Sequence, residues 1–254
     1  GQQVQIIGQS GRILATAYVN PHSLITARIL MEGETAVLER PFVAQRLRQA
    51  DALRRTLYPR PYYRLLHGEG DLFPGLIIDR YARHFVVQCN TAGVEGMLNP
   101  IVDVLVNDFN AESVFLRNDA SIRKLEGLPL ETHCAYGSTP PSVIVEEHGW
   151  AFEVSLSQGQ KTGWFYDQRA NRARMVSYVS GRRVLDLFSY VGAWGVQAAA
   201  LGAEQVLCVD SSQDALDKTA SNAQRNNVSS KVSTLKADVF DALEQLRAEN
   251  RSFD

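Results

Sequence analysis

The stretch VLDLFSYVGAWGVQAAALGAEQVLCVD, residues 184–210, decides the fold of the C-terminal part of the chain. Its hydrophobic pattern predicts a strand over 184–188, a loop of small residues, a helix over 193–201 and a second strand over 205–209. An open parallel sheet built from such β–α–β units binds nucleotides at the carboxyl ends of its strands. The loop nevertheless lacks the G-x-G-x-x-G fingerprint of folds that bind dinucleotides. The ligand must therefore be identified from other residues at the same edge.

Aspartates lie at the carboxyl ends of three successive predicted strands. Asp186 lies within the first strand, Asp210 ends the second, and Asp238 follows a strand predicted over 231–236. A single aspartate at such a turn is better explained as a helix cap, but three together favour a ligand. A carboxylate near the first loop opposes the pyrophosphate of NAD or FAD, so the ligand is cationic or neutral there. S-adenosylmethionine fits, because it carries a sulfonium, an ammonium, a ribose and an adenine but no phosphate.

Strands and helices alternate on both sides of this stretch. A helix over 167–178, with Asp167 as its N-cap, precedes the first strand, and a helix over 240–250 leads to a fourth strand at Phe253. This alternation predicts a parallel sheet with helices on both faces. Because the chain starts with Gly1 and stops where the fourth strand begins, we expect a fragment cut inside its last domain.

Two further domains are expected before this sheet. Residues 1–30 alternate in short strand-like runs, which are typical of a small barrel or sheet, and a helix over 42–57 follows. After a proline-rich break come more strands, a helix and a hairpin with His148-Gly149 as its turn. The expected domains are a small β domain over 1–61, a central α+β domain over 62–157 and the α/β domain over 158–254.

Composition and cysteine usage exclude several classes of protein. The chain is 45% hydrophobic and 21% charged, as in globular domains rather than disordered chains. No apolar run approaches the roughly 18 residues of a membrane helix. Three scattered cysteines without a C-x-x-C spacing argue against a disulfide framework or a zinc site and fit a reducing cytoplasm. The five scattered histidines likewise predict no metal site.

Charge is distributed unevenly along the chain, although the net charge is only −2. Residues 1–64 hold nine arginines, no lysine and four acids, which gives +5, whereas the remaining residues carry −7. A basic module favours an anionic polymer such as RNA as a partner. The arginines also fit the solvated face of an amphipathic helix, and charge alone does not decide between the two. The candidate RNA-binding residues lie on the helix over 42–57: Arg46, Arg48, Arg54 and Arg55.

Short motifs at the three strand ends resemble the first three motifs of class I S-adenosylmethionine-dependent methyltransferases. They are D-x-F-x-x-x-G at 186–192, V-D-x-S at 209–212 and A-D-V-F at 237–240. Two longer stretches, EEHGWAFEV at 146–154 and GQKTGWFYDQRANR at 159–172, resemble the bacterial ribosomal large-subunit methyltransferase I family. That family methylates C5 of a cytosine in 23S rRNA. The resemblance covers essentially the whole chain, and the segment GQKTGWFYDQR is long and specific.

The resemblance implies a Rossmann-like class I methyltransferase domain, truncated at its C-terminal end, after a PUA-like β-barrel and a central α+β domain. It implies S-adenosylmethionine as cofactor, ribosomal RNA as partner, a cytoplasmic location and no membrane association, and it leaves a homodimer open. Beside the cofactor, Lys161 and Arg169 can pair with the methionine carboxylate, and Thr162 can donate a hydrogen bond. The alternative is a turn and helix start whose aromatic residues belong to the core. The expected cofactor-binding residues are Lys161, Thr162, Phe165, Tyr166, Arg169, Asp186, Phe188, Ser189, Gly192, Asp210, Ser211, Asp238 and Val239.

The mechanism that the resemblance implies needs a cysteine thiolate, which adds to C6 of cytosine before C5 takes the methyl group. The family's nucleophilic cysteine and substrate loop fall after the position of Asp254, so we expect no catalytic residue in this chain and no activity from it alone. Cys89 and Cys208 lie in predicted strands where burial raises a thiol pKa, and Cys134 lies in a predicted loop. Three rival hypotheses are a methyltransferase acting on another RNA base such as guanine N2, a nicotinamide oxidoreductase and a non-catalytic RNA-binding protein.

Overall fold

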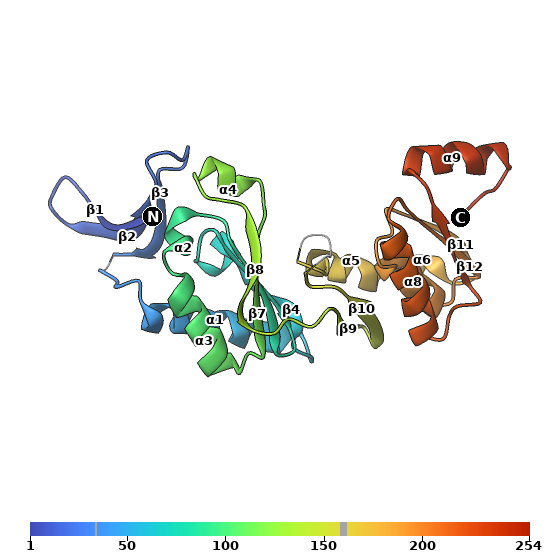
Figure 1. The fold of residues 1–254 in the computed structure, drawn as a ribbon, viewed down its shortest axis with the longest axis horizontal. Coiled ribbons are helices and arrows are strands. Elements are labelled where there is room, and N and C mark those ends of the chain that lie inside the picture. Colours follow the sequence, from blue (N-terminus) through green and yellow to red (C-terminus); the bar gives the residue numbers. More distant parts are fainter. Residues whose placement is uncertain (34, 158–161) are drawn as a thin grey trace. The chain divides into compact units, whose positions relative to one another are not determined.

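The computed structural model describes residues 1–33, 35–157 and 162–254, which fall into two compact units (Figure 1). Unit 1 comprises Gly1–Pro141 and Leu156–Gly163. Unit 2 comprises Ser142–Ser155 and Trp164–Asp254. The chain therefore passes from unit 1 into unit 2, returns to unit 1 and then enters unit 2 again.

An antiparallel sheet opens unit 1. Its strands lie in the order β1 (Gln2–Ile7), β2 (Ile13–Val19) and β3 (Ala27–Glu32). Tyr18 on β2 joins this sheet to the rest of the unit, since its ring packs against Gly93 and its hydroxyl donates to the carbonyl of Pro74 at 2.7 Å. The expected small β structure is therefore a sheet that shares a buried core with the elements after it.

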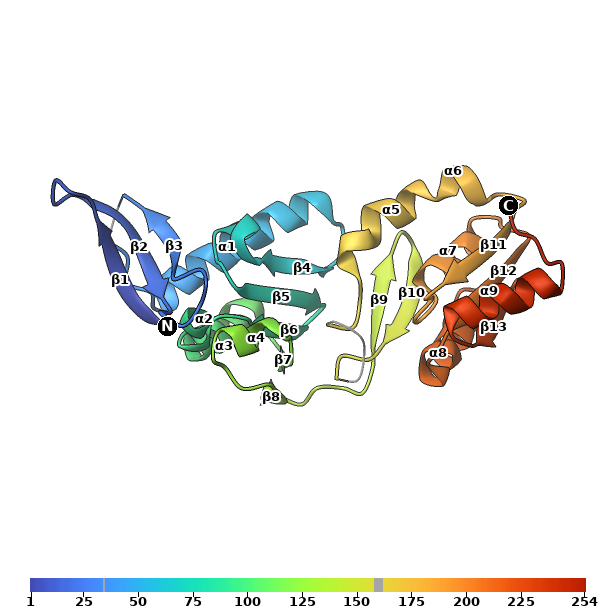
Figure 2. The ribbon, with the colours of Figure 1, turned by 90° about the horizontal axis from the view of Figure 1, so that it is seen from above.

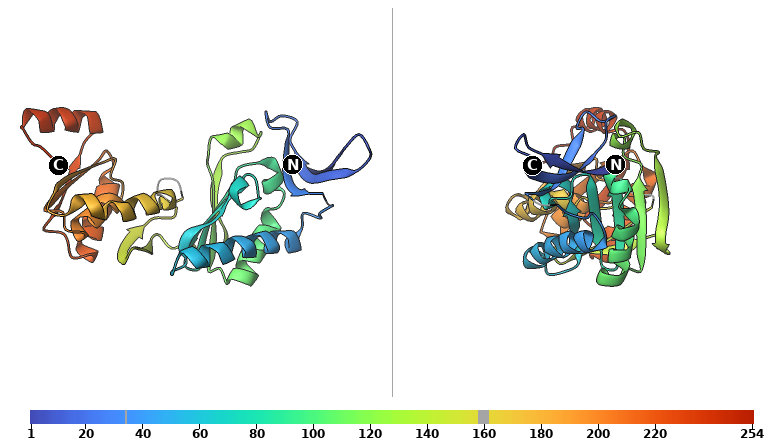
Figure 3. Two further views of the ribbon diagram at one scale, coloured as in Figure 1. Left: turned by 180° about the vertical axis from the view of Figure 1, so that it is seen from behind. Right: turned by 90° about the vertical axis from the view of Figure 1, so that its left-hand side faces the viewer.

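A five-stranded sheet forms the centre of unit 1. Its strands follow chain order: β4 (Tyr62–His67), β5 (Leu76–Tyr81), β6 (His84–Cys89), β7 (Ser113–Asn118) and β8 (Glu131–Gly137). Only β6 and β7 pair in parallel, and α3 (Leu98–Phe109) lies between them in the chain. The helix α1 (Arg40–Leu57) packs beside α3 and against β4 (Figure 3), so its apolar face belongs to the core of this sheet.

Cys134 lies in β8 and not in a loop, which corrects the expectation from the sequence. β8 pairs antiparallel with β7, and Cys134 lies opposite Phe115. β8 is an edge strand, and none of its residues is buried. The sequence ETHCAYG therefore lacks the apolar alternation by which a half-buried strand is recognised.

A two-stranded hairpin opens unit 2. It consists of β9 (Val143–Glu147) and β10 (Trp150–Val154), as the sequence predicts. His148 and Gly149 have positive φ values of 53° and 88°, as a two-residue hairpin turn with matching twist requires. The hairpin packs on α8 (Gln213–Arg225), because the amides of Asn222 and Asn226 bond to the β10 backbone. It therefore lies in unit 2, although the domain boundary expected at residue 157 would place it with the central sheet.

A parallel sheet with helices on both faces completes unit 2 (Figure 2). Its order is β11 (Arg183–Leu187), β12 (Gln205–Asp210) and β13 (Val232–Lys236). On one face, Val206 and Cys208 approach Gly195 of α7 (Ala193–Ala200), where any side chain would collide with the Cys208 sulfur. On the other face, Leu207 and Val209 pack against α9 (Val239–Ala248). The predicted α/β architecture is confirmed.

The helix predicted over 167–178 is divided into shorter pieces. Asp167 lies inside a 3₁₀ turn rather than at an N-cap, so that expectation was wrong. The turn forms because the Gln168 N–H donates to the carbonyl of Phe165, three residues back. The pieces are η2 (Tyr166–Gln168), α5 (Arg169–Arg174) and α6 (Val176–Val179).

The fourth strand expected at Phe253 does not form within the residues that the structure describes. The segment nevertheless lies beside β11, since the Asp254 N–H donates to the carbonyl of Arg183 at 3.0 Å. A single backbone bond does not make a ladder, which needs repeated pairing along two strands.

Candidate functional site

The loop between β11 and α7 has an unusual backbone. Phe188 and Tyr190 have positive φ values of 56° and 50°, and Gly192 has 77°. A left-handed conformation is strained for bulky residues and is retained mainly at binding and catalytic sites. Gly192 cannot be replaced at low cost, because a Cβ there would lie 2.7 Å from the methyl group of Thr219. The loop is therefore the first candidate for a ligand site in unit 2.

Hydrogen bonds from neighbouring elements fix this loop in place. The Ser189 N–H donates to the carbonyl of Val209, and the Tyr190 N–H donates to Asp210 Oδ2, each at 2.9 Å. From α8, the Thr219 hydroxyl donates to the carbonyl of Tyr190 at 3.0 Å. The loop is thus preorganised, which lowers the entropic cost of binding a ligand.

Asp210 lies at the carboxyl end of β12 and links two loops. Its Oδ2 accepts from Tyr190 and its Oδ1 accepts from the Ser212 N–H at 2.9 Å. A carboxylate oxygen has two lone pairs, so each can accept one further hydrogen bond. Ser211, the next predicted residue, is exposed beside it.

Asp186 lies beneath α7 rather than at the exposed edge of the sheet. The pKa of Asp186 is raised to about 7, chiefly by burial and also by the charge of Asp210, although a hydrogen bond from the Gly195 N–H at 2.8 Å opposes the shift. The neighbouring Cys208 sulfur is 3.9 Å from Asp186 Oδ2. The Asp186 carboxylate thus contacts other groups of the protein, and a hydrogen bond from the cofactor to Asp186 stays a prediction.

Asp186→Asn is expected to remove a pH dependence from the stability of unit 2. Because the folded pKa of about 7 exceeds the ordinary 3.8, the folded chain keeps a proton that the unfolded chain releases. Wild-type stability therefore falls as pH rises from 3.8 to about 7, by about 1.4 kcal/mol per pKa unit. Denaturant titrations across this range should show the variant gaining stability relative to wild type. Parallel pH profiles for the two proteins would contradict the assignment.

The edge beyond β13 carries a second acidic residue and exposed aromatic surface. Asp238 is exposed and caps α9 by accepting from the Phe240 N–H at 2.8 Å. Val239 is buried in the core, so its side chain is unsuited to ligand contact. Phe188 and Phe240 are 69% and 71% exposed at the carboxyl ends of β11 and β13. Large aromatic side chains left in water at a sheet edge are suited to stacking on a flat ligand.

Ser189 offers a further polar group. The residue is 3% exposed, and its Oγ has no hydrogen-bond partner among the described residues. A buried hydroxyl in that state is costly unless a ligand completes its hydrogen bonding. The donors and acceptors at this edge therefore fit a neutral or cationic nucleoside.

The segment after residue 161 reaches the same loop through Phe165. Its ring meets that of Tyr190 edge to face, with centroids 5.8 Å apart. Tyr166 is buried and Arg169 begins α5. Thr162 belongs to unit 1, where its hydroxyl donates to Asp79, and Lys161 lies outside the described residues. The structure thus brings Phe165 to the loop and leaves the roles of the others as predictions.

A buried ion pair, which sequence reasoning missed, holds this segment. Glu147 on β9 accepts two hydrogen bonds from Arg172 at 2.5 and 2.9 Å, one from Trp164 at 3.0 Å and one from Gln197 at 3.1 Å. Burial alone would raise the pKa of Glu147, but the hydrogen bonds and charge of Arg172 lower it below its ordinary value. The two stretches quoted above, 146–154 and 159–172, thus contact each other. Each stretch contains several charged residues, so the sequence carries no local signal that singles out Glu147 and Arg172.

The four candidate RNA-binding arginines of α1 all have partners in unit 1. Arg54 makes a two-bond ion pair with Asp71 at 2.5 and 2.6 Å, and Arg46 donates to the carbonyl of Leu30 at 2.6 Å. Arg48 pairs with Asp108 and Arg55 with Asp51, each at 2.7 Å. Only the last two arginine side chains stay largely exposed, at 66% and 69%. Arg46 and Arg54 are therefore used for internal structure.

Replacing Arg48 and Arg55 with glutamine is expected to reduce the salt dependence of RNA binding by about one to two units of slope. Both are exposed cations whose surface ion pairs are weak and can be exchanged for phosphate contacts. Filter binding over a series of salt concentrations measures the slope. Arg83→Gln, which removes another exposed cation of unit 1, serves as the control. An unchanged slope in the double variant would assign the arginines to a solvated helix face.

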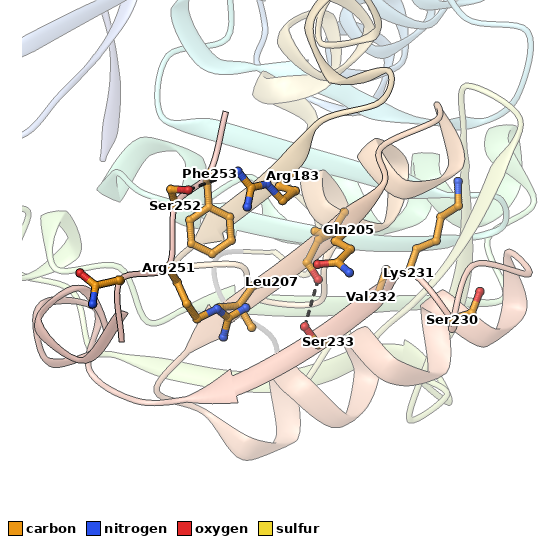
Figure 4. Close-up of a pocket in the computed structure, with 12 residues that line it drawn as sticks. Arg183, Gln205, Leu207, Ser230, Lys231, Val232, Ser233, Arg251, Ser252 and Phe253 are labelled. Atoms are coloured by element: carbon orange, nitrogen blue, oxygen red, sulfur yellow. Dashed lines mark hydrogen bonds between the residues drawn. The ribbon is translucent and has the colours of Figure 1, made fainter. Parts of the chain in front are cut away.

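A pocket of about 410 Å³ also lies in unit 2, at the opposite ends of the strands (Figure 4). Arg183, Gln205 and Val232, the first residues of the three strands, line it together with Phe253. Because open α/β sheets bind ligands at the carboxyl ends of their strands, this pocket is not the candidate cofactor site.

The part of the chain that the structure describes contains neither a cluster of metal ligands nor a membrane-spanning helix. Within residues 1–33, 35–157 and 162–254, no group of three or more His, Cys, Asp or Glu side chains could hold a metal ion. In the same ranges, no helix is both long and apolar enough to cross a membrane.

Two family models match the chain. One, described as S-adenosylmethionine-dependent methyltransferase, matches residues 113–252. The other, described as a PUA-like domain, matches residues 1–32. The first match covers more than half of the chain and includes all of the parallel sheet.

The chain is similar over its whole length to curated enzymes. It is 39% identical to ribosomal RNA large subunit methyltransferase I from Aliivibrio fischeri and 38% identical to the protein of that name from Yersinia pseudotuberculosis. It spans 65% of the length of each relative.

Solved structures share the fold. A proposed S-adenosylmethionine-dependent methyltransferase from Streptococcus mutans superimposes with a TM-score of 0.84 at 23% identity, over all of this chain and 66% of that one. A second proposed methyltransferase, complexed with SAH, gives a TM-score of 0.85 at 24% identity, with the same coverage. The tRNA m1G37 methyltransferase of M. jannaschii gives 0.53 at 21% identity, over 65% of this chain and 50% of that one. At these identities the likeness concerns the fold alone.

Proposed function

Because the chain belongs to the S-adenosylmethionine-dependent methyltransferases, we propose that it provides the cofactor site of an enzyme that methylates large-subunit ribosomal RNA. The preorganised loop at residues 188–192 carries the proposal, since it combines strained backbone, a serine hydroxyl without a partner among the described residues and a hydrogen bond to the Asp210 carboxylate. The relatives' names support the RNA substrate and, with it, a cytoplasmic location.

S-adenosylmethionine, when bound, supplies an electrophilic methyl group on its sulfonium. The residues of this chain bind and orient it. Asp210 accepts from the ribose hydroxyls through its free lone pairs, and Asp238 accepts from the adenine amine. Phe188 and Phe240 cover the adenine, because their rings are exposed at the edge where it would lie. Arg169 pairs with the methionine carboxylate.

The cofactor assignment is tested by ligand-induced stabilisation of the chain. S-adenosylhomocysteine should raise the melting temperature of the chain in a concentration-dependent manner, and NADH should not. Stabilisation by NADH alone would favour the nicotinamide oxidoreductase hypothesis. Stabilisation by neither ligand, with RNA binding intact, would favour a non-catalytic RNA-binding protein.

We further infer that the methylated atom is C5 of a cytosine, as in the family that the sequence resembles. The alternative is another RNA base, such as guanine N2. Mass spectrometry of nucleosides from RNA treated with an enzyme that includes this chain distinguishes 5-methylcytidine from N2-methylguanosine. The base must leave the stack to reach the methyl group, so single-stranded or extruded cytosine is the expected substrate.

Replacing Cys89, Cys134 and Cys208 with serine is expected to leave methyl transfer largely intact in an enzyme that includes this chain. Cys89 and Cys208 are fully buried, as predicted, and burial raises the pKa of Cys89 to about 12 and that of Cys208 well above its ordinary value. Neither forms a thiolate near neutral pH. Cys134 is exposed, on an edge strand of unit 1.

Transfer of methyl groups from labelled S-adenosylmethionine to rRNA measures the effect of the triple variant. Cys134→Ser alone is the informative comparison, because its thiol is the accessible one. Loss of transfer in that variant, with cofactor binding preserved, would place the nucleophile on β8.

A further inference from the structure

A pocket of about 480 Å³ lies in unit 1, where the loop between β2 and β3 meets the turn before β5 and the short helix α4 (Ile122–Leu125). Ile25, Ile77 and Ile122 line it with apolar surface, and Asn90 and Arg28 supply polar groups. We name it the Asn90 pocket. Small-molecule sites are of this kind, mostly apolar with a few polar groups and about 300–1,000 Å³ in volume.

Asn90 carries unused hydrogen-bonding capacity. Its Oδ1 is buried and has no partner among the described residues. The adjacent Thr91 is satisfied, since its Oγ1 lies 2.9 Å from the Tyr18 hydroxyl. A buried acceptor without a partner destabilises the folded state, so this one points to a ligand that donates an N–H group.

The positive charge of Arg28 at the Asn90 pocket is already neutralised by carboxylates. The Arg28 side chain is 13% exposed and pairs with Glu126 at 3.1 Å, and it lies 3.9 Å from Glu69. Asn20 fixes Glu126 by donating to it at 2.9 Å. Arg28 is therefore not available to a phosphate group, and the pocket favours a neutral ligand.

The loop between β2 and β3 places apolar side chains in water beside the Asn90 pocket. Leu24 is 101% exposed and Ile25 is 56% exposed. The loop is nevertheless anchored, because the Asn20 N–H donates to the carbonyl of Thr26 at 2.9 Å. Exposed apolar residues on an anchored loop mark a contact surface, and such side chains insert between stacked bases in nucleic-acid complexes.

We propose that the Asn90 pocket holds one extruded base of the RNA substrate, away from the base that is methylated. The amino or imino N–H of that base donates to Asn90 Oδ1, and the isoleucines contact its flat faces. This proposal rests on the proposed RNA substrate. Single-stranded RNA is read in this way, by bases that leave the stack and are recognised at their edges.

Fluorescence polarisation with the full chain and labelled oligo(A), oligo(C) and oligo(U) of about ten nucleotides tests the proposal. Wild type is expected to prefer one oligonucleotide. Ile122→Trp fills the pocket from an exposed position and should weaken that binding at least about fivefold. Leu125→Trp, on the same helix but outside the pocket lining, is the matched control and should change it by less than about twofold. Asn90→Leu should remove the preference.

The outcomes separate this proposal from the proposed function. Equal effects of the two tryptophan variants, or a preference that survives Asn90→Leu, would overturn the base pocket while RNA binding stands. Failure of wild type to bind any of the three oligonucleotides would contradict the RNA substrate itself. Sedimentation velocity, which measures the oligomeric state, tests one further alternative. A dimer that dissociates in Ile122→Trp would show that a second copy of the chain occupies the pocket.

Discussion

Glu147→Ala is expected to lower the free energy of unfolding of unit 2 by about 3–5 kcal/mol. The carboxylate is 1% exposed and accepts from three side chains, so its removal leaves Arg172, itself 0% exposed, as an unpaired buried charge. Arg172 also lies over the Trp164 ring at 4.9 Å and donates to the carbonyl of Phe165. The same substitution should therefore loosen Phe165 and, through it, the cofactor loop.

Denaturant unfolding monitored by tryptophan fluorescence measures this loss. Glu153→Ala is the matched control on the same hairpin, since Glu153 pairs with Arg225 at 3.0 Å on the surface and should change stability by about 0–1 kcal/mol. The Glu147 contribution is present above its ordinary pKa of 4.5 and is lost as pH falls through the lower folded pKa. A loss in Glu147→Ala no larger than in the control would show that the buried pair is not what holds the segment.

Asp210→Ala is expected to weaken binding of S-adenosylhomocysteine by about tenfold to a hundredfold, equal to about 1.5–3 kcal/mol. The substitution removes the expected partner of the ribose hydroxyls. It also leaves the Tyr190 and Ser212 N–H groups without their acceptor, so the loop loses its preorganised form.

Isothermal titration calorimetry with the chain measures this affinity. Asp214→Ala removes an exposed carboxylate from the first turn of α8 and is the matched control, with no expected change in affinity. Asp210→Asn keeps one acceptor oxygen and should fall between the two. Wild-type affinity in Asp210→Ala would remove this residue from the cofactor site.

The α/β part of the fold could be predicted because each element carries its own local signal. The strands β11 and β12 of the parallel sheet are mainly apolar runs, and the turn His148-Gly149 fits a two-residue hairpin. β8 was missed because an edge strand need not bury either face. The packing of α1 on the central sheet was missed because an amphipathic stripe shows that a face is buried and not what covers it.

In the candidate site, too, only those residues could be predicted that have a local signal in the sequence. Asp210 could be located from its position at a strand end, which is a local property. The partners of Glu147 lie 17, 25 and 50 residues away in the chain, so no pattern within a window of sequence relates them. The strain at Phe188 and Tyr190 was also invisible, because the neighbouring elements impose it and not the residues themselves.

The discontinuous course of unit 2 has a consequence for the order of events during synthesis. The hairpin leaves the ribosome before the elements on which it packs, since Asn222 and Asn226 follow their β10 partners by 69 and 75 residues. At about 5–20 residues per second, the hairpin waits several seconds with its apolar face uncovered. Unit 1 is still incomplete when the hairpin appears, because Leu156–Gly163 follows it. A nascent chain stalled within this interval would keep Glu147 hydrated and the apolar face of the hairpin exposed until α7 and α8 emerge.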